Sequence, residues 1–148
     1  MGSGKSTVGR IVAQKLGWEF IDVDQQVERK FGKSIPEIFG EFGEAQFRKW
    51  ETEYLVSIRK DPAIVATGGG CFIHNPDWML EHGIVIYLDV PLQTLAKRLG
   101  ADASRPLWQN AESLFHEREQ HYRKAHYSID GVDDPEAIAS QIILLCNP

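Results

Sequence analysis

The first residues of the chain have the types and spacing of a phosphate-binding loop. Residues 2–7 read GSGKST, which is the closing part of the pattern G-x-x-x-x-G-K-[ST]. Small residues let consecutive backbone N–H groups curl around a phosphate, and a following helix directs its positive end at the same anion. Lys5 is then expected to reach the β- and γ-phosphates of a nucleotide, and the Ser6 hydroxyl to ligate Mg²⁺. The residues predicted to bind the phosphates are Gly2, Ser3, Gly4, Lys5, Ser6 and Thr7.

The full pattern would place its first glycine, and the buried strand that precedes it, upstream of Met1. On this motif alone, a chance glycine-rich N-terminal arm is therefore an open alternative to a phosphate site. The remaining residues have to decide between the two interpretations.

Asp22 and Asp24 are the first candidates for metal binding and proton transfer. Residues 18–24 read WEFIDVD, a short strand in which alternate side chains would place both carboxylates on one side, at the carboxyl end. Two carboxylates there could hold Mg²⁺ through water and accept a proton from a substrate hydroxyl. The alternative is a solvated acidic turn.

Three consecutive glycines, Gly68, Gly69 and Gly70, follow the apolar run AIVAT at 63–67. Glycine permits positive φ angles and a close approach of the backbone to a ligand. A simple tight turn needs only one or two glycines. The run therefore indicates a place where the chain passes close to a ligand.

Arg48 lies at the edge of an apolar helical stripe within residues 44–51. It could pair with Glu44 or Glu51 on the surface, or present its planar fork to a bound carboxylate. Spacing alone favours the surface pair.

Arg118 is predicted to lie on the inward stripe of its helix, together with Ala111, Leu114, Phe115 and Tyr122. An unpaired charge on that side is costly. Arg118 therefore needs an anionic partner, which could be a structural salt bridge or a bound carboxylate or phosphate.

Residues 100–110, GADASRPLWQN, are rich in turn-forming types. Proline holds the Arg105-Pro106 pair extended. A loop that carries one arginine could be a lid that closes on a nucleotide; an ordinary surface loop is the alternative.

Apolar patterns predict the elements that position these residues. A helix follows the glycines, with Val8, Ile11, Val12 and Leu16 at helical spacing, and Gly17 ends it. Strands are predicted at 18–24, 63–67, 83–90 and 126–130, with helical patterns between them. Near-continuous apolar runs are typical of strands buried on both faces of a parallel sheet. The order predicts an α/β fold with ligands at the carboxyl ends of the strands.

Composition sets limits on the function. A chain of 148 residues is long enough for one domain with a core, and 43% hydrophobic with 25% charged residues is ordinary for a globular protein. A net charge of −5 argues against general affinity for nucleic acid or anionic membranes. Two distant cysteines argue against a disulfide framework. With no membrane-length apolar run and no signal-peptide pattern, we expect a cytoplasmic protein.

Taken together, the motifs closely resemble those of the shikimate kinase family, in the family's order. They are GSGKST at 2–7, D-x-D at 22–24, F-R-x-x-E at 47–51, GGG at 68–70, R-P-L at 105–107 and E-R-x-x-x-Y at 117–122. The resemblance covers essentially the whole chain. It implies a three-layer α/β/α P-loop fold with a five-stranded parallel sheet, whose first strand this sequence lacks.

The resemblance also implies a role for each candidate. Residues 2–7 would cradle the phosphates of ATP, Ser6 would ligate Mg²⁺ and Asp22 would act on the metal through water. Asp24 would bind the acceptor's hydroxyls and serve as base, and Arg105 would close over ATP from the lid at 100–110. Arg48 and Arg118 would hold the shikimate carboxylate beside residues 68–70, where Gly69 offers its backbone to the acceptor.

Three departures from the family are visible. The missing first strand would leave two neighbours unpaired and a hole in the core, so the chain could be marginal or inactive; a late start or a truncation is the preferred explanation. The segment from Arg105 to Arg118 is short for the family, and Trp108 replaces an aliphatic residue in the lid.

The sequence therefore predicts an ATP-dependent, Mg²⁺-requiring enzyme that phosphorylates shikimate on its 3-hydroxyl, on the route to chorismate and aromatic amino acids. We expect a monomer with small-molecule substrates. The alternatives are another small-molecule kinase of similar fold, such as a gluconate kinase, and a non-catalytic, shikimate-kinase-like binding module.

Overall fold

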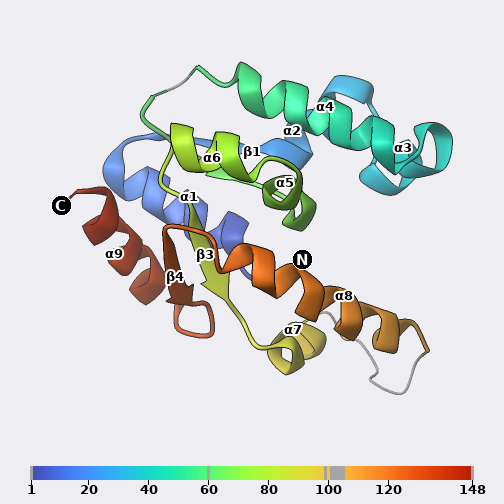
Figure 1. Ribbon diagram of the computed structural model, residues 1–148. Helices are drawn as coiled ribbons and strands as arrows, with labels where there is room; N and C mark the ends of the chain where they lie inside the picture. The colour runs from blue at the N-terminus through green and yellow to red at the C-terminus, as the bar shows by residue number, and fades with distance from the viewer. Residues whose placement is uncertain (1, 60, 99, 101–105, 148) are drawn as a thin grey trace.

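A computed structural model of the chain describes residues 2–59, 61–98, 100 and 106–147, with only the backbone described at 106–111. Helices and strands alternate along the chain, as predicted for an α/β fold. In Figure 1, α2 (Val23–Phe31), α3 (Ile35–Phe42) and α4 (Glu44–Ser57) gather at one end of the molecule. The long helix α8 (Pro106–Tyr122) runs across it beside α5 (Gly69–His74).

The described strands form two separate parallel pairs. Strand β1 (Glu19–Asp22) pairs with β2 (Ala63–Ala66), and β3 (Ile86–Asp89) pairs with β4 (Tyr127–Asp130). Asp22 lies opposite Ala66, and Asp89 lies opposite Asp130, so each pair ends in register. Within the described residues, β2 and β3 each have a partner along one edge only. This is the pairing expected for a sheet that lacks a central strand.

One apolar core joins the two strand pairs. Helix α1 (Lys5–Leu16) and helix α9 (Pro135–Cys146) pack against each other. Val8 and Val12 of α1 lie in the same cluster as Leu88 of β3, and Ile64 of β2 packs against that cluster. Helix α1 therefore bridges both pairs and holds the N-terminal loop at a fixed place relative to each.

Local signals explain where several helices begin and end. Helix α1 ends at Gly17, whose φ of 68° is left-handed, as predicted for a glycine stop. Ser34 and Glu37 form a reciprocal capping box at the start of α3. Helices α6 (Pro76–His82) and α7 (Leu92–Arg98) complete the set of described elements. None of the helices in the described part of the chain is both long and apolar enough to cross a bilayer.

Two expectations about the strands were wrong. The strands are four residues each, and most of their side chains are only partly buried or exposed, with Val65 36% accessible. A strand in a two-stranded pair has a neighbour along one edge only, so less of its surface is covered than in a continuous sheet. The predicted strand at 18–24 also ends early, at Asp22, whose side chain accepts the Gln25 N–H and begins α2. Asp24 therefore lies in the first turn of a helix rather than on a strand.

Candidate active site

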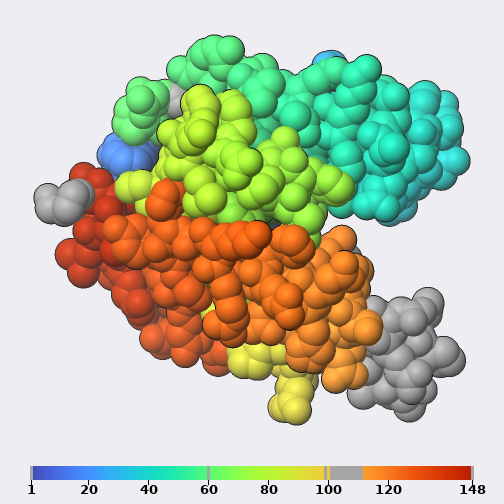
Figure 2. Space-filling model, viewed as in Figure 1, coloured from blue at the N-terminus to red at the C-terminus, as the bar shows by residue number. Residues whose placement is uncertain are grey.

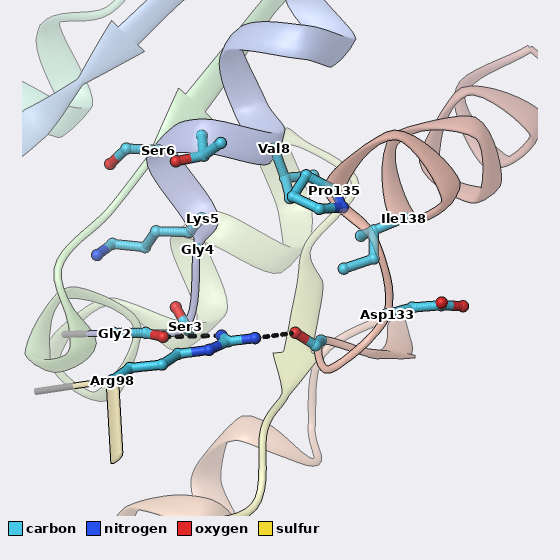
Figure 3. Close-up of a pocket in the computed structure, with 12 residues that line it drawn as sticks. Gly2, Ser3, Gly4, Lys5, Ser6, Val8, Arg98, Asp133, Pro135 and Ile138 are labelled. Carbon is cyan, nitrogen blue, oxygen red and sulfur yellow. Dashed lines mark hydrogen bonds between the residues drawn. The ribbon is translucent and has the colours of Figure 1, made fainter. Parts of the chain in front are cut away.

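The N-terminal loop forms one wall of a cavity of about 560 Å³ (Figure 3). Gly2 and Gly4 have positive φ angles of 78° and 81°, which glycine adopts without strain, and α1 begins directly after them. The cavity is lined by the loop and by Val8, Arg98, Gly131, Asp133, Pro135 and Ile138. A helix start with left-handed glycines beside a lysine is suited to bind phosphates. The predicted residues 2–7 all line this cavity.

Arg98 connects the two sides of the cavity. Its guanidinium donates to the Gly2 carbonyl at 2.9 Å and to the Gly131 carbonyl at 3.2 Å, as the dashed lines in Figure 3 show. Gly131 follows β4, and Pro135 and Ile138 of α9 add an apolar surface next to it. The cavity therefore offers phosphate-binding backbone at one end and an apolar surface at the other.

Ser6 and Asp22 bring oxygen ligands together. The Ser6 hydroxyl donates to Oδ2 of Asp22 at 3.0 Å, and the other carboxylate oxygen is used by the Gln25 N–H. Hydroxyl and carboxylate oxygens are the hard ligands that Mg²⁺ prefers, with water and phosphate oxygens completing its shell. The residues therefore fit the predicted metal. The described residues contain no cluster of three or more His, Cys, Asp or Glu for another kind of metal site.

Asp24, in the first turn of α2, is influenced electrostatically by the lysine of the loop and the arginine of α4. Burial raises the pKa of Asp24 above its ordinary value, and the negative charge of Asp22 adds to this effect. The positive charges of Lys5 and Arg48 oppose it. Asp24 therefore binds a proton more tightly than an ordinary aspartate, and both cations act on it electrostatically. It does so from a helix and not from the predicted strand.

Arg48 and Glu51 form an ion pair that is largely withdrawn from water. Arg48 Nη1 donates to Glu51 Oε2 at 2.9 Å, and the Glu51 side chain is fully buried. Burial raises the pKa of Glu51, and Arg48 opposes this effect. Arg48 also pairs with Glu44 at 3.3 Å, but its side chain is only 15% exposed. The predicted partners are correct, whereas the predicted surface setting is wrong.

The triple glycine lets side chains from two other helices press against the backbone. A Cβ at Gly68 would lie 2.8 Å from Asp24 Oδ2, and one at Gly70 would overlap the Arg48 guanidinium. Gly68 has a φ of −66°, and the positive-φ glycines among the described residues do not include residues 68–70. The expected positive φ angles were wrong, and the close neighbours that the structure shows are protein side chains, while the approach to a ligand stays a prediction. The glycines are needed here for space.

Arg118 approaches the same glycines from the opposite side. A Cβ at Gly69 would lie 3.6 Å from Arg118 Nη1 and 2.9 Å from the Tyr122 hydroxyl. Gly69 is exposed, while Gly70 is buried beneath Arg48. Figure 2 shows a hollow between the α3–α4 end of the molecule and α8, the helix that carries Arg118. The two arginines therefore face adjacent glycines, one from each wall.

The α8 stripe only partly follows the prediction. Arg118 and Tyr122 are partly buried, but Leu114 is 45% exposed and does not belong to an inward stripe. Helix α8 begins at Pro106, within the predicted lid. Arg105 lies outside the described residues, and so do the side chain of Trp108 and that of Ala111.

Three residues of the site were not assigned a role from the sequence. Glu51 appeared only as a surface partner of Arg48, and its full burial depends on packing that spacing does not reveal. Arg98 binds backbone carbonyls distant in sequence, for which no local pattern exists. Tyr122 was noted in a motif without a function; its hydroxyl donates to the Gly69 carbonyl.

Comparisons with known proteins show the family of the chain. The family model for shikimate kinase matches residues 1–147. The shikimate kinase of Synechococcus elongatus is 40% identical over 153 residues, covering 97% of this chain and 80% of the relative. The structure of the Acinetobacter baumannii shikimate kinase in complex with shikimate aligns with a TM-score of 0.85 at 38% identity, covering 99% of this chain and 88% of that one. The Aquifex aeolicus shikimate kinase structure aligns with a TM-score of 0.86 at 35% identity, covering 97% and 90%.

Proposed function

Because the chain belongs to the shikimate kinase family, we propose that it transfers the γ-phosphoryl group of ATP to the 3-hydroxyl of shikimate. The observation that carries this proposal is the convergence of Arg48 and Arg118 on neighbouring glycines, beside a carboxylate of raised pKa. Two guanidinium groups on one side of an acceptor are suited to a carboxylate-bearing substrate.

The nucleotide occupies the cavity behind the N-terminal loop. The backbone of residues 2–7 holds the phosphates, and Lys5 neutralises charge on the transferred group. Ser6 would hold Mg²⁺ directly and Asp22 through water; when bound, the metal would neutralise negative charge on the nucleotide's phosphates. Arg105 closes over ATP from the lid at 100–110. Pro135 and Ile138 supply the apolar end of the cavity to the base.

Shikimate lies between α4, α5 and α8. Arg48 and Arg118 hold its carboxylate, and residues 68–70 face it with their backbone. Asp24 accepts hydrogen bonds from its hydroxyls. Because Asp24 is held close to Lys5, the acceptor oxygen it orients is directed towards the phosphates.

In the transfer step, Asp24 takes the proton of the 3-hydroxyl while the oxygen bonds to the γ-phosphorus. The bond between that phosphorus and the bridging oxygen of ADP breaks, so the products are shikimate 3-phosphate and ADP. Burial favours the proton on Asp24, which makes it a better base than an exposed aspartate. Lys5 and Arg105 offset the charge that develops on the phosphoryl group.

We further propose that residues 1–148 act as one domain, as a monomer in the cytoplasm. The acceptor site supports the first point, because its residues come from α2, α4, α5 and α8, far apart in the sequence. Gel filtration with light scattering tests the monomer.

Shikimate-dependent release of ADP from Mg-ATP tests the function, with gluconate as a parallel acceptor. We expect release with shikimate and none with gluconate. Release with gluconate alone would overturn the choice of acceptor. Stabilisation by shikimate and ATP without turnover would support the non-catalytic binding module instead.

A further inference from the structure

Tyr122 connects two helices that are distant in sequence. It is the last residue of α8, and its hydroxyl donates a hydrogen bond to the Gly69 carbonyl in the first turn of α5. Its ring packs on Tyr87 of β3, with centroids 5.2 Å apart. The side chain therefore has a fixed direction, set by the strand on one side and by the glycine backbone on the other.

Arg118 lies one helical turn before Tyr122, on the same face of α8. Both side chains approach Gly69, and Arg118 and Arg48 each act electrostatically on the Tyr122 hydroxyl. The hydrogen bond that holds Tyr122 against Gly69 therefore also sets the distance between Arg118 and α5. The other polar groups on this side of the site are backbone groups of residues 68–70, and glycines have no side chains to hold them in place.

We infer that Tyr122 is a positioning residue for the acceptor site: its hydroxyl latches α8 to the start of α5, and so fixes Arg118 against the exposed Gly69 backbone. Misplacement of a binding group by about 1 Å is enough to weaken a site strongly. This inference rests on the proposed function for its effect on shikimate, but the latch itself is a property of the protein alone.

Tyr122→Phe tests the latch because it removes only the hydroxyl and keeps the ring on Tyr87. Tyr127→Phe is the matched control, since Tyr127 lies on β4 with 44% of its surface exposed. Amide hydrogen exchange of both variants without ligands comes first. We expect faster exchange at residues 68–74 in Tyr122→Phe only, and equal protection in the two variants would overturn the latch.

The second measurement is the affinity for shikimate, by calorimetric titration without nucleotide, and the KM values of both substrates. Tyr122→Phe should weaken shikimate binding about fivefold, the scale of one lost hydrogen bond, and leave the KM for ATP within about twofold. Equal changes for both substrates, or none for shikimate, would contradict the positioning role. A wild-type protein that does not phosphorylate shikimate would overturn the proposed function, while the exchange experiment would still decide the latch.

Discussion

The two halves of the proposed site are made of different chemical groups. The acceptor half consists of Asp24, Arg48, Glu51 and residues 68–70, where charged side chains press against a backbone without side chains. The nucleotide half consists of residues 2–7, Arg98 and the segment after β4, which surround a cavity with backbone groups. In the first half, the charges are partly or fully withdrawn from water. In the second half, consecutive residues of one loop form a wall, and the side chain of Arg98 binds backbone carbonyls there.

This difference has an energetic consequence. Buried charges cost free energy unless they are paired, so the acceptor half carries a stability cost that its function requires. Backbone groups in a loop carry no comparable cost. In the acceptor half, a substitution that removes a charge should therefore change both stability and activity. Whether stability rises or falls depends on how that charge is paired.

Asp24→Asn should produce the largest effect. It removes the proposed base, and kcat should fall by about a thousandfold, within the range for loss of general base catalysis. The same change should raise the melting temperature at neutral pH. Steady-state kinetics and thermal unfolding of the same preparation measure both.

The sign of the stability change follows from the raised pKa of Asp24. The folded state binds the proton more tightly than the unfolded state, so this group's contribution to stability falls as the pH rises above the ordinary value of 3.8 towards the raised one. Asparagine has no such pH dependence. A variant that is less stable than the wild type at pH 7 would show that Lys5 and Arg48 outweigh burial.

Arg118→Ala should produce the next largest effect, and only on one substrate. Loss of a charge-assisted contact to the carboxylate should raise the KM for shikimate about 30-fold and leave the KM for ATP nearly unchanged. Arg123→Ala is the control, because Arg123 is 62% exposed and pairs with Glu119 near the end of the same helix. Equal effects of Arg118→Ala on both substrates would contradict the separation of the two halves.

Sequence reasoning predicted the local structure of the proposed nucleotide half well, because that information is local. The glycines, Lys5 and Ser6 are consecutive, and the left-handed conformation of Gly4 and the start of α1 follow from that order. Gly17 likewise ends α1 where the pattern predicts. Consecutive residues fix their own backbone, so a short motif is enough.

The proposed acceptor half is made of residues that the sequence singled out, but their geometry was not predicted. Asp24 was placed on a strand because alternation was extended past Asp22, whose capping of α2 ends the strand. The burial of Glu51 depends on α4 packing against α5, and the need for glycine at 70 depends on where Arg48 points. These are contacts between elements far apart in the chain, so the resemblance to a family supplied roles that spacing could not.

Glu51→Gln should sharpen the comparison through stability. Burial raises the pKa of Glu51 even with Arg48 beside it, so, with the same sign as for Asp24, the neutral amide should raise the unfolding free energy at pH 7. The KM for shikimate should rise, because Arg48 loses the anion that holds it in place. Glu44→Gln is the matched control, since Glu44 pairs with the same arginine but is 58% exposed. Its melting temperature should barely change. Equal changes of stability in the two variants would mean that burial of Glu51 does not govern the pair.

Gly9→Ala tests α1, the helix that joins the two halves of the site. We expect it to have the smallest effect of these substitutions. A Cβ at Gly9 would lie 2.8 Å from the Phe20 ring and 3.4 Å from Ile64, so α1 would have to move away from β1 and β2. Overpacking should cost about 1 kcal/mol after the helical gain of alanine is subtracted. Gly40→Ala, in α3 with nothing within 4 Å of its Cβ, should instead stabilise the protein slightly. If α1 positions the loop against both strand pairs, Gly9→Ala should also raise the KM for ATP, whereas Gly40→Ala should not.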